Sequence, residues 1–276
     1  MKLLKTSLWL CGSIFLVSNA YAHYPYVAPL SYQTFNNHSA IVSGFYDNPF
    51  APEIAIKNFK FHYHNPQGEK IEIADDQWAK TQTLSSMSLE NKMDGTYRVR
   101  GIKQGSITQF ALDGSVWKTL IGGKLAADKP ASTKVIYESQ LGKKSKTKTV
   151  QVTELIETFV SRRNTSTKVI EHLHDGFDIQ FLTHPNAIQA NQPIHLKVLD
   201  NKKGIANLDV EILTQTVDFS RDTKVYKKIT TDAQGNLNFT IKDKGQYLLK
   251  IDYQQPFETK GDSLKRYKYT LSFNVI

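Results

Sequence analysis

The stretch TTDAQGNLNFTIKDKGQYLLKIDY, residues 230–253, carries the pattern that decides the fold. Its Asp-x-x-Gly segment supplies a tight turn with a glycine that is free to adopt positive φ. The residues that follow alternate, so that Leu237, Phe239 and Ile241 would point inward from one strand. Because a period of two is typical of half-buried strands, the stretch predicts strands joined by tight turns.

The same alternation extends outward over the second half of the chain. Seven segments carry it, at the spacing of a β-sandwich: residues 177–182, 194–199, 207–215, 224–230, 236–241, 246–254 and 266–275. Segments of the first half alternate as well, at residues 58–64, 95–101, 106–112 and 132–139. A helix is expected only near residues 75–84, and it would be short.

These segments predict an all-β protein of two β-sandwich domains, immunoglobulin-like or transthyretin-like. The sequence HLHDG interrupts the strand pattern at residues 172–176 and places the domain boundary there. We therefore expect an N-terminal domain at residues 23–172 and a C-terminal, seven-stranded domain at residues 173–276. Both would follow a cleaved signal peptide at residues 1–22.

The first 22 residues have the three parts of a secretory signal. Lys2 and Lys5 supply the positive start, residues 8–17 form a short apolar stretch, and residues 20–22 are the small-x-small cleavage pattern. No other apolar run is long enough to cross a bilayer. The pattern predicts a periplasmic protein that begins at His23 after cleavage behind Ala22.

Cysteine and charge limit the function classes. The single cysteine, Cys11, lies inside the predicted signal peptide, so the mature chain would have no disulfide. Loss of Lys2 and Lys5 lowers the formal net charge from +9 to +7, but export argues against nucleic acid as a partner. The densest basic run, at residues 142–149, is expected to be a solvated loop or a lysine-guarded edge strand. Its alternative role is attraction to an anionic membrane or an acidic partner.

Five of the eight histidines form the candidate metal site. His23, as a free N-terminus, would offer its α-amine and its ring Nδ1 to one ion. His62 and His64 lie two residues apart on a predicted strand, so their side chains would share a face. Their face also carries Lys60, and the alternative is a pair of solvent-facing histidines on a polar surface.

His172 and His174 repeat this spacing at the predicted domain junction, beside Glu171 and Asp175. Clefts between domains are common ligand sites, although a solvated linker would have the same sequence. Of the remaining histidines, His184 would help to close a junction site. His195 is expected to have a structural role, and no role is assigned to His38. Asp47 and Glu53 are weaker candidates for extra ligands.

Without cysteine in the mature chain, a metal site must use nitrogen and oxygen ligands. Such ligands suit nickel, cobalt, zinc or copper(II), and argue against copper(I) and iron–sulfur clusters. Nucleotide-binding, hydrolase and metalloprotease motifs are missing from the sequence. The sequence therefore favours a binding protein over an enzyme.

The second half also resembles a known family. The residues that carry the resemblance are Gly176, Phe177, Ile179, Leu182, Pro185, Pro193, Val198, Gly204, Val210, Thr231, Asp232 and Gly235. In the first half, Ala22, His23 and Tyr24 and the segment 44–56 correspond to the start of the same family. The family is the NikM-like group of periplasmic proteins of unassigned function, described as the periplasmic component of cobalt or nickel uptake. The resemblance implies a role in metal capture for a membrane uptake system.

Three functions therefore compete. The first is a periplasmic protein that binds nickel, cobalt, zinc or copper and assists its uptake. The second is a metal-free adaptor that contacts a protein or a sugar, because a sandwich fold alone assigns no function. The third is a copper-dependent oxidative enzyme with a histidine brace at His23.

Overall fold

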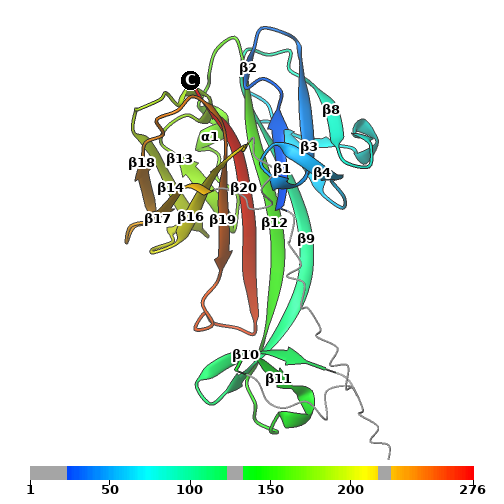
Figure 1. The fold of residues 1–276 in the computed structure, drawn as a ribbon, viewed down its shortest axis with the longest axis vertical. Helices are drawn as coiled ribbons and strands as arrows, with labels where there is room; N and C mark the ends of the chain where they lie inside the picture. The colour runs from blue at the N-terminus through cyan, green and yellow to red at the C-terminus, as the bar shows by residue number, and fades with distance from the viewer. Residues whose placement is uncertain (1–23, 123–132, 217–224) are drawn as a thin grey trace, which may run out of the picture.

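The computed structural model describes residues 24–122, 133–216 and 225–276, which are mostly β-strand (Figure 1). The predicted signal peptide and His23 lie outside the described residues. Helical structure in the described part is limited to four short elements: η1 (Asp75–Gln77), η3 (Glu138–Gln140), α1 (Lys168–Glu171) and η4 (Pro185–Ala187). The expectation of a mostly β chain is confirmed, and the immunoglobulin-like or transthyretin-like assignment stays a prediction.

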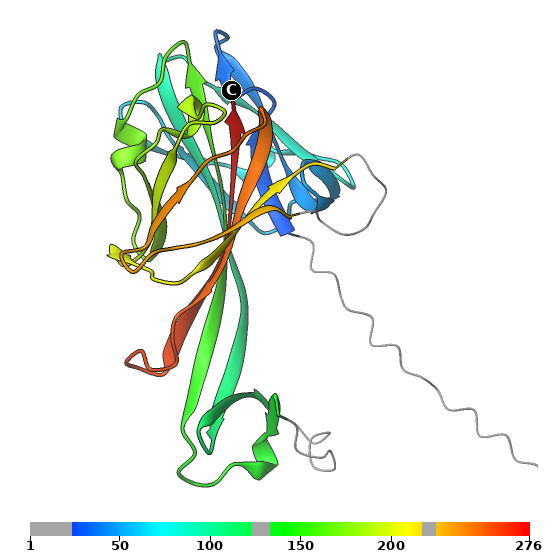
Figure 2. The same ribbon diagram turned by 60° about the vertical axis from the view of Figure 1, so that its left-hand side comes forward.

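An 11-stranded sheet forms the centre of the molecule. Its main path runs through β11 (Val135–Tyr137), β10 (Val116–Ile121), β9 (Gly95–Asp113), β12 (Thr147–Arg162), β20 (Ser263–Val275), β19 (Gly245–Gln254), β16 (Asp209–Thr214) and β17 (Val225–Thr230). Three strands attach to its side: β2 (Gln33–Thr34), β5 (Lys60–His64) and β6 (Lys70–Ile73). Figure 2 shows β9 and β12 running side by side from the body of the fold to β10 and β11.

Two smaller sheets complete the fold. The first contains β1 (Tyr24–Pro29), β3 (His38–Asn48), β4 (Ala51–Ala55), β7 (Ala79–Lys80) and β8 (Ser85–Glu90). The second contains β13 (Phe177–Phe181), β14 (Ile194–Asp200), β15 (Lys203–Gly204) and β18 (Asn236–Phe239). The three sheets account for all seven strands predicted in the second half, within a few residues at their ends.

The central sheet is continuous across the predicted domain boundary. In its middle, β12 pairs antiparallel with β9 from the first half and parallel with β20 from the second. The parallel pairing runs over ten residues of each strand, from Thr149 opposite Ser263 to Thr158 opposite Ser272. The hydrogen bonding therefore joins both halves of the chain in one sheet. The domain boundary between residues 172 and 173 stays a prediction.

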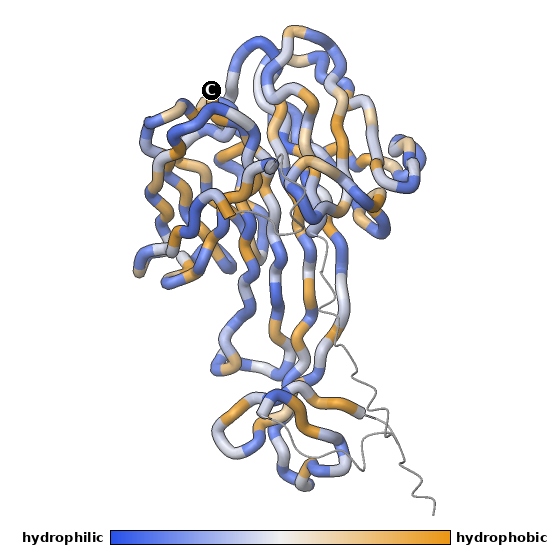
Figure 3. Tube along the Cα trace, in the orientation of Figure 1, coloured by the Kyte–Doolittle hydropathy of each residue, from blue (hydrophilic) through white to orange (hydrophobic). Residues whose placement is uncertain are grey.

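Both faces of the central sheet are covered along the second half of β12, as the alternation there shows. Leu155 and Phe159 enter a core shared with β13, β14 and the C-terminal strands, which we call the C-terminal core. Ile156 and Val160 point the other way, into an N-terminal core with residues of β1, β3, β5, β8 and β9. The alternating hydropathy of these strands can be followed in Figure 3. From Leu155 to Arg162, where both faces are covered, β12 buries every side chain, whether apolar or charged.

The structure corrects three sequence predictions. Residues 95–101 and 106–112 belong to a single strand, β9, instead of two. The helix expected near residues 75–84 is one 3-10 turn, η1, followed by the two-residue strand β7. The lysine-rich run is the expected solvated loop at residues 142–146 and then enters β12; only the edge-strand alternative is wrong, because β12 is an internal strand.

Gly204 marks a close approach between two loops of the C-terminal half. A Cβ atom at Gly204 would lie 1.9 Å from the backbone oxygen of Gln234, in the turn that the sequence predicts from Asp232 to Gly235. We expect Gly204→Ala to lower the free energy of unfolding by about 1–3 kcal/mol, because backbone must shift to make room. Urea unfolding measures this, with Gly142→Ala as the control, since its nearest neighbour is Ser145 Oγ at 3.8 Å. Equal midpoints for both variants would contradict the prediction.

Candidate metal centre

The strand β5 presents two histidines to the interior. Phe61 and Tyr63 point into or against the N-terminal core, as the alternation predicts. His62 and His64 take the opposite face, yet only 4% and 3% of their surface is exposed. The alternative of two solvent-facing histidines on a polar surface is therefore wrong. The reason is that this face of the central sheet is also covered, by the segment that links α1 to β13.

That linking segment carries His172 and His174. Arg98 on β9 donates from Nη1 to the backbone oxygen of His172 at 2.7 Å and holds the segment against the sheet. The backbone N–H of His174 donates to Asp178 Oδ2 at 2.8 Å, four residues further on in β13. These two anchors hold the segment against the sheet, while Glu171, His172 and Asp175 stay exposed, so the solvated-linker alternative holds for only part of the segment.

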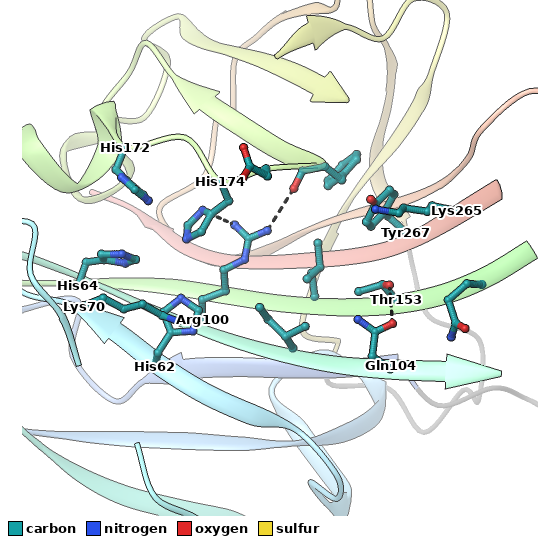
Figure 4. A pocket seen from close by; sticks show the side chains of 15 residues that line it. His62, His64, Lys70, Arg100, Gln104, Thr153, His172, His174, Lys265 and Tyr267 are labelled. Carbon is teal, nitrogen blue, oxygen red and sulfur yellow. Dashed lines mark hydrogen bonds between the residues drawn. The ribbon is translucent and has the colours of Figure 1, made fainter. Parts of the chain in front are cut away.

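The two His-x-His pairs lie together, as Figure 4 shows. The ring of His64 lies 4.7 Å from that of His172 and 5.5 Å from that of His174, measured between centroids. His62 lies 5.9 Å from His174 and 5.4 Å from His64. The sequence left open whether the pairs share a site, and the structure brings all four rings into one cluster.

Three members of this cluster have the spacing of a metal site. His62, His64 and His174 each offer one ring nitrogen, and these three atoms lie within 4.8 Å of one another. A tetrahedral zinc site with bonds of about 2.0–2.1 Å needs its nitrogens about 3.3 Å apart, so small side-chain rotations would suffice. Each of the three rings also has a buried nitrogen without a hydrogen-bond partner in the described residues, namely His62 Nε2, His64 Nδ1 and His174 Nε2. Such atoms are costly to bury unless a ligand satisfies them.

A buried network of charged residues lies behind the histidines. Arg98 donates to both carboxylate oxygens of Glu157, at 2.7 and 3.0 Å, and to Asp178 Oδ1 at 2.7 Å. Arg100 donates to the same Asp178 oxygen at 2.9 Å, and the hydroxyl of Tyr269 donates to Glu157 Oε2 at 2.6 Å. Two guanidinium groups thus neutralise two carboxylates, and all four charged side chains are at most 2% exposed.

The network also determines which nitrogen of His174 is available. His174 Nδ1 lies 3.0 Å from Asp178 Oδ2 and 2.9 Å from Arg100 Nη1. Only an Nδ1–H group can donate to the carboxylate, and the guanidinium has Asp178 Oδ1 as its own acceptor. The proton on Nδ1 leaves a lone pair on Nε2 for the cluster, as in the carboxylate–histidine pairs of metal sites.

Burial keeps these imidazoles neutral. It lowers the pKa of His62 to about 3 and that of His64 to about 4, with smaller contributions from neighbouring positive groups. Burial also lowers the pKa of His174, although its hydrogen bond with Asp178 opposes the change. Arg98 and Arg100 outweigh the effect of burial on Asp178 and lower the pKa of its carboxyl well below the usual value. At neutral pH the cluster therefore presents neutral imidazole, the form that binds metal.

The metal-free protein should lose stability in mild acid because of these shifts. Between pH 6.5 and about 4, the unfolded chain takes up protons at His62 and His64 that the folded chain does not. From pH 7.5 to 5.5 we expect a loss of about 1.4 kcal/mol for each of the two histidines. Urea unfolding at a series of pH values, with a strong chelator present, measures this loss. The double variant H62Q/H64Q should show a correspondingly weaker pH dependence, and His195→Gln should follow the parent. Equal pH dependence in the parent and the double variant would refute the expectation.

A cavity of about 400 Å³ opens beside the histidines. All four histidines of the cluster line it, together with Arg100. The rest of its wall contains charged, polar and apolar side chains, which are Lys70, Ile102, Gln104, Gln151, Thr153, Leu155, Asp175, Phe177, Lys265 and Tyr267. Figure 4 shows Lys70 beside His62 and His64. The cavity connects the candidate ligands with a space much larger than one ion.

Other predicted ligands lie elsewhere. His184 bonds to Thr96 Oγ1 and to the Ser166 carbonyl, and its Nδ1 accepts from the Asn186 backbone; it is not among the residues that line the cavity, so it does not help to close this site. His195 is exposed on β14, with Nδ1 2.6 Å from Asn238 Oδ1. The remaining candidates outside the cavity wall are His38 and Asp47 on β3 and Glu53 on β4. A role for His23 stays a prediction.

Sequence reasoning missed the charged network. Each of its members stands inside an apolar strand segment: Arg98 and Arg100 in YRVRG, Glu157 in LIETF, and Asp178 in FDIQF. A charged residue in such a run is the signal that could have identified them, because buried charges are retained only when paired. The carboxylate that contacts a site histidine is accordingly Asp178, rather than Glu171 or Asp175.

Comparisons with known proteins give a family and little else. The sequence pattern of a family described as "Domain of unknown function (DUF4198)" matches residues 20–255. No curated protein matches the chain. Two chains from solved structures titled "Marsupial T cell receptor" align with 91% and 92% of this chain and 74% and 72% of their own, at 9% identity and TM-scores of 0.20 and 0.21. Scores this low carry no argument about fold or function. Within the described residues, none of the helices combines the length and hydrophobicity that a membrane span requires.

Proposed function

The chain belongs to the DUF4198 family, whose function is unknown, and we propose that it binds a divalent transition-metal ion through His62, His64 and His174. The observation that supports this most strongly is the group of three imidazoles, two of them buried and that of His174 15% exposed, each with a nitrogen that has no partner in the described residues. The all-nitrogen ligand set suits nickel, cobalt, zinc or copper(II). His172, whose ring lies 4.7 Å from that of His64, is the nearest further ligand.

The chain's own residues act by binding and orienting. Asp178 holds the Nδ1 proton of His174 and so directs Nε2 toward the ion. Burial keeps His62 and His64 free of protons, so the ion need not displace any at neutral pH. Binding is reversible coordination, and the proposed role is capture of the metal in the periplasm and delivery to an uptake system, without catalysis. The signal-peptide pattern and the family resemblance noted from the sequence support this location and role.

Metal titration tests the proposal. Nickel, cobalt, zinc and copper(II) are each titrated into the metal-free protein by calorimetry, and one ion per chain is expected for at least one of them. The His23→Ala variant should still bind, because the three proposed ligands come from β5 and the segment before β13 and do not include His23. Failure of all four metals to bind at micromolar concentration would remove the proposal. Loss of binding in His23→Ala alone would transfer the site to the N-terminus.

A further inference from the structure

The charge balance around the histidines leaves a bound ion with too little negative charge. The three imidazoles are neutral donors, and the nearest carboxylates, Glu157 and Asp178, are already neutralised by Arg98 and Arg100. Asp175 is the one carboxylate on the cavity wall in the described part of the chain; it is exposed, and Lys70 on the same wall offsets its charge. A divalent ion held by these imidazoles would therefore keep most of its charge. Such a charge is stable only when an opposite charge accompanies it. The structure has no spare buried carboxylate in the described part of the site to serve this purpose.

The cavity next to the histidines has room for such an anion. Its volume of about 400 Å³ falls within the range of small-molecule pockets, about 300–1,000 Å³. At about 30 Å³ for each water molecule, it would otherwise hold roughly a dozen waters. An ion with its bare coordination shell fills only a small part of this space.

The far end of the cavity is suited to a negative group. Figure 4 shows the histidines toward one side and Lys265, Gln104 and Thr153 toward the other, with Arg100 between them. Thr153 donates to Gln104 Oε1 at 3.2 Å, which leaves the amide nitrogen of Gln104 as a donor. Arg100 is 2% exposed, and its Nε has no partner among the described residues. Cationic and donor groups thus line the space that the histidines leave open.

We propose that this cavity takes up the metal as a complex with a small organic polycarboxylate, with the ion at the histidines and a free carboxylate at Lys265 and Gln104. The inference rests on the proposed function and names the substrate class of the same site. The polycarboxylate supplies the negative charge that the protein lacks, and it fills the coordination positions that three imidazoles leave open. Metal alone binds at the histidine end, and the complex uses the whole cavity.

Equilibrium dialysis with radiolabelled citrate tests this. The nickel-loaded protein should retain one citrate per chain, and the metal-free protein should retain at least tenfold less. Lys265→Gln should weaken citrate retention by about tenfold while nickel binding without citrate changes less than twofold. Lys268→Gln is the matched control, since Lys268 is a lysine on the same strand that does not line the cavity. It should behave as the parent.

The outcomes separate the two proposals. If none of the four metals binds in the absence of citrate, the proposed function is overturned. One ion bound per chain without retention of citrate overturns the polycarboxylate complex alone. Equal citrate retention by the parent and Lys265→Gln overturns the assigned position of the carboxylate, and with it the proposed mode of binding.

Discussion

The His64→Gln variant should bind its metal at least roughly 100-fold more weakly than the parent protein, equivalent to about 2.8 kcal/mol. His64 is the most central ring of the cluster, because it lies within 5.5 Å of His62, His172 and His174 between centroids. Changes to residues that merely orient a ligand already cost about 10–100-fold in affinity, so loss of a ligand should cost more. Competition with a coloured chelator of known affinity measures the difference.

Two controls keep this experiment specific. His38→Gln and His195→Gln remove histidines that are exposed on β3 and β14 and do not line the cavity. Both should bind as the parent does, within about twofold. His62→Gln and His174→Gln should repeat the loss seen for His64→Gln, since all three nitrogens belong to one group. Unchanged affinity in all three variants would show that the metal binds elsewhere.

The largest effect on stability is expected from Glu157→Gln. This substitution leaves Arg98 and Arg100 with Asp178 as the only full negative charge in a network that is almost completely buried. Breaking a buried ion pair by removing one partner costs about 3–5 kcal/mol, because the remaining charge is uncompensated. Urea unfolding followed by circular dichroism measures the loss.

Glu154→Gln is the matched control for this substitution. Glu154 lies three residues earlier on the same strand and pairs with Lys103 at 3.2 Å, with both side chains partly exposed. Its loss should cost about 0–1 kcal/mol, as for other pairs in contact with solvent. If Glu157→Gln does not fold, the double variant R98M/E157L provides a second measurement, since apolar replacement of a whole buried pair is often neutral. A cost for Glu157→Gln no larger than for Glu154→Gln would refute the role of the network.

The strands could be predicted from local pattern because their cause is local. Alternation at Leu237 and Phe239, with a turn before them, needs no knowledge of the rest of the chain. The opposite orientation of Phe61 and His62 on β5 follows from the same rule and is confirmed. The two His-x-His pairs were also visible, since spacing alone places both rings of a pair on one face.

Burial of the polar face could not be predicted in this way. Whether His62 is solvated or enclosed depends on the link from α1 to β13, which lies more than one hundred residues away in the chain. The same holds for Arg98, whose partners Glu157 and Asp178 come from two other strands. Such long-range packing leaves no periodic signal in the sequence, apart from a charged residue within an apolar run.

The sequence by itself determined that the chain is built mainly of strands, and that five histidines are its candidate ligands. Only the tertiary structure decided that His62, His64 and His174 meet. They meet because β5 pairs with β9 in the central sheet and the segment before β13 lies against the histidine face of β5. It also decided their chemistry. Burial of His62 and His64 and partial burial of His174 leave each ring with a nitrogen that has no partner in the described residues, and a neutral nitrogen of this kind is what a metal ion can bind.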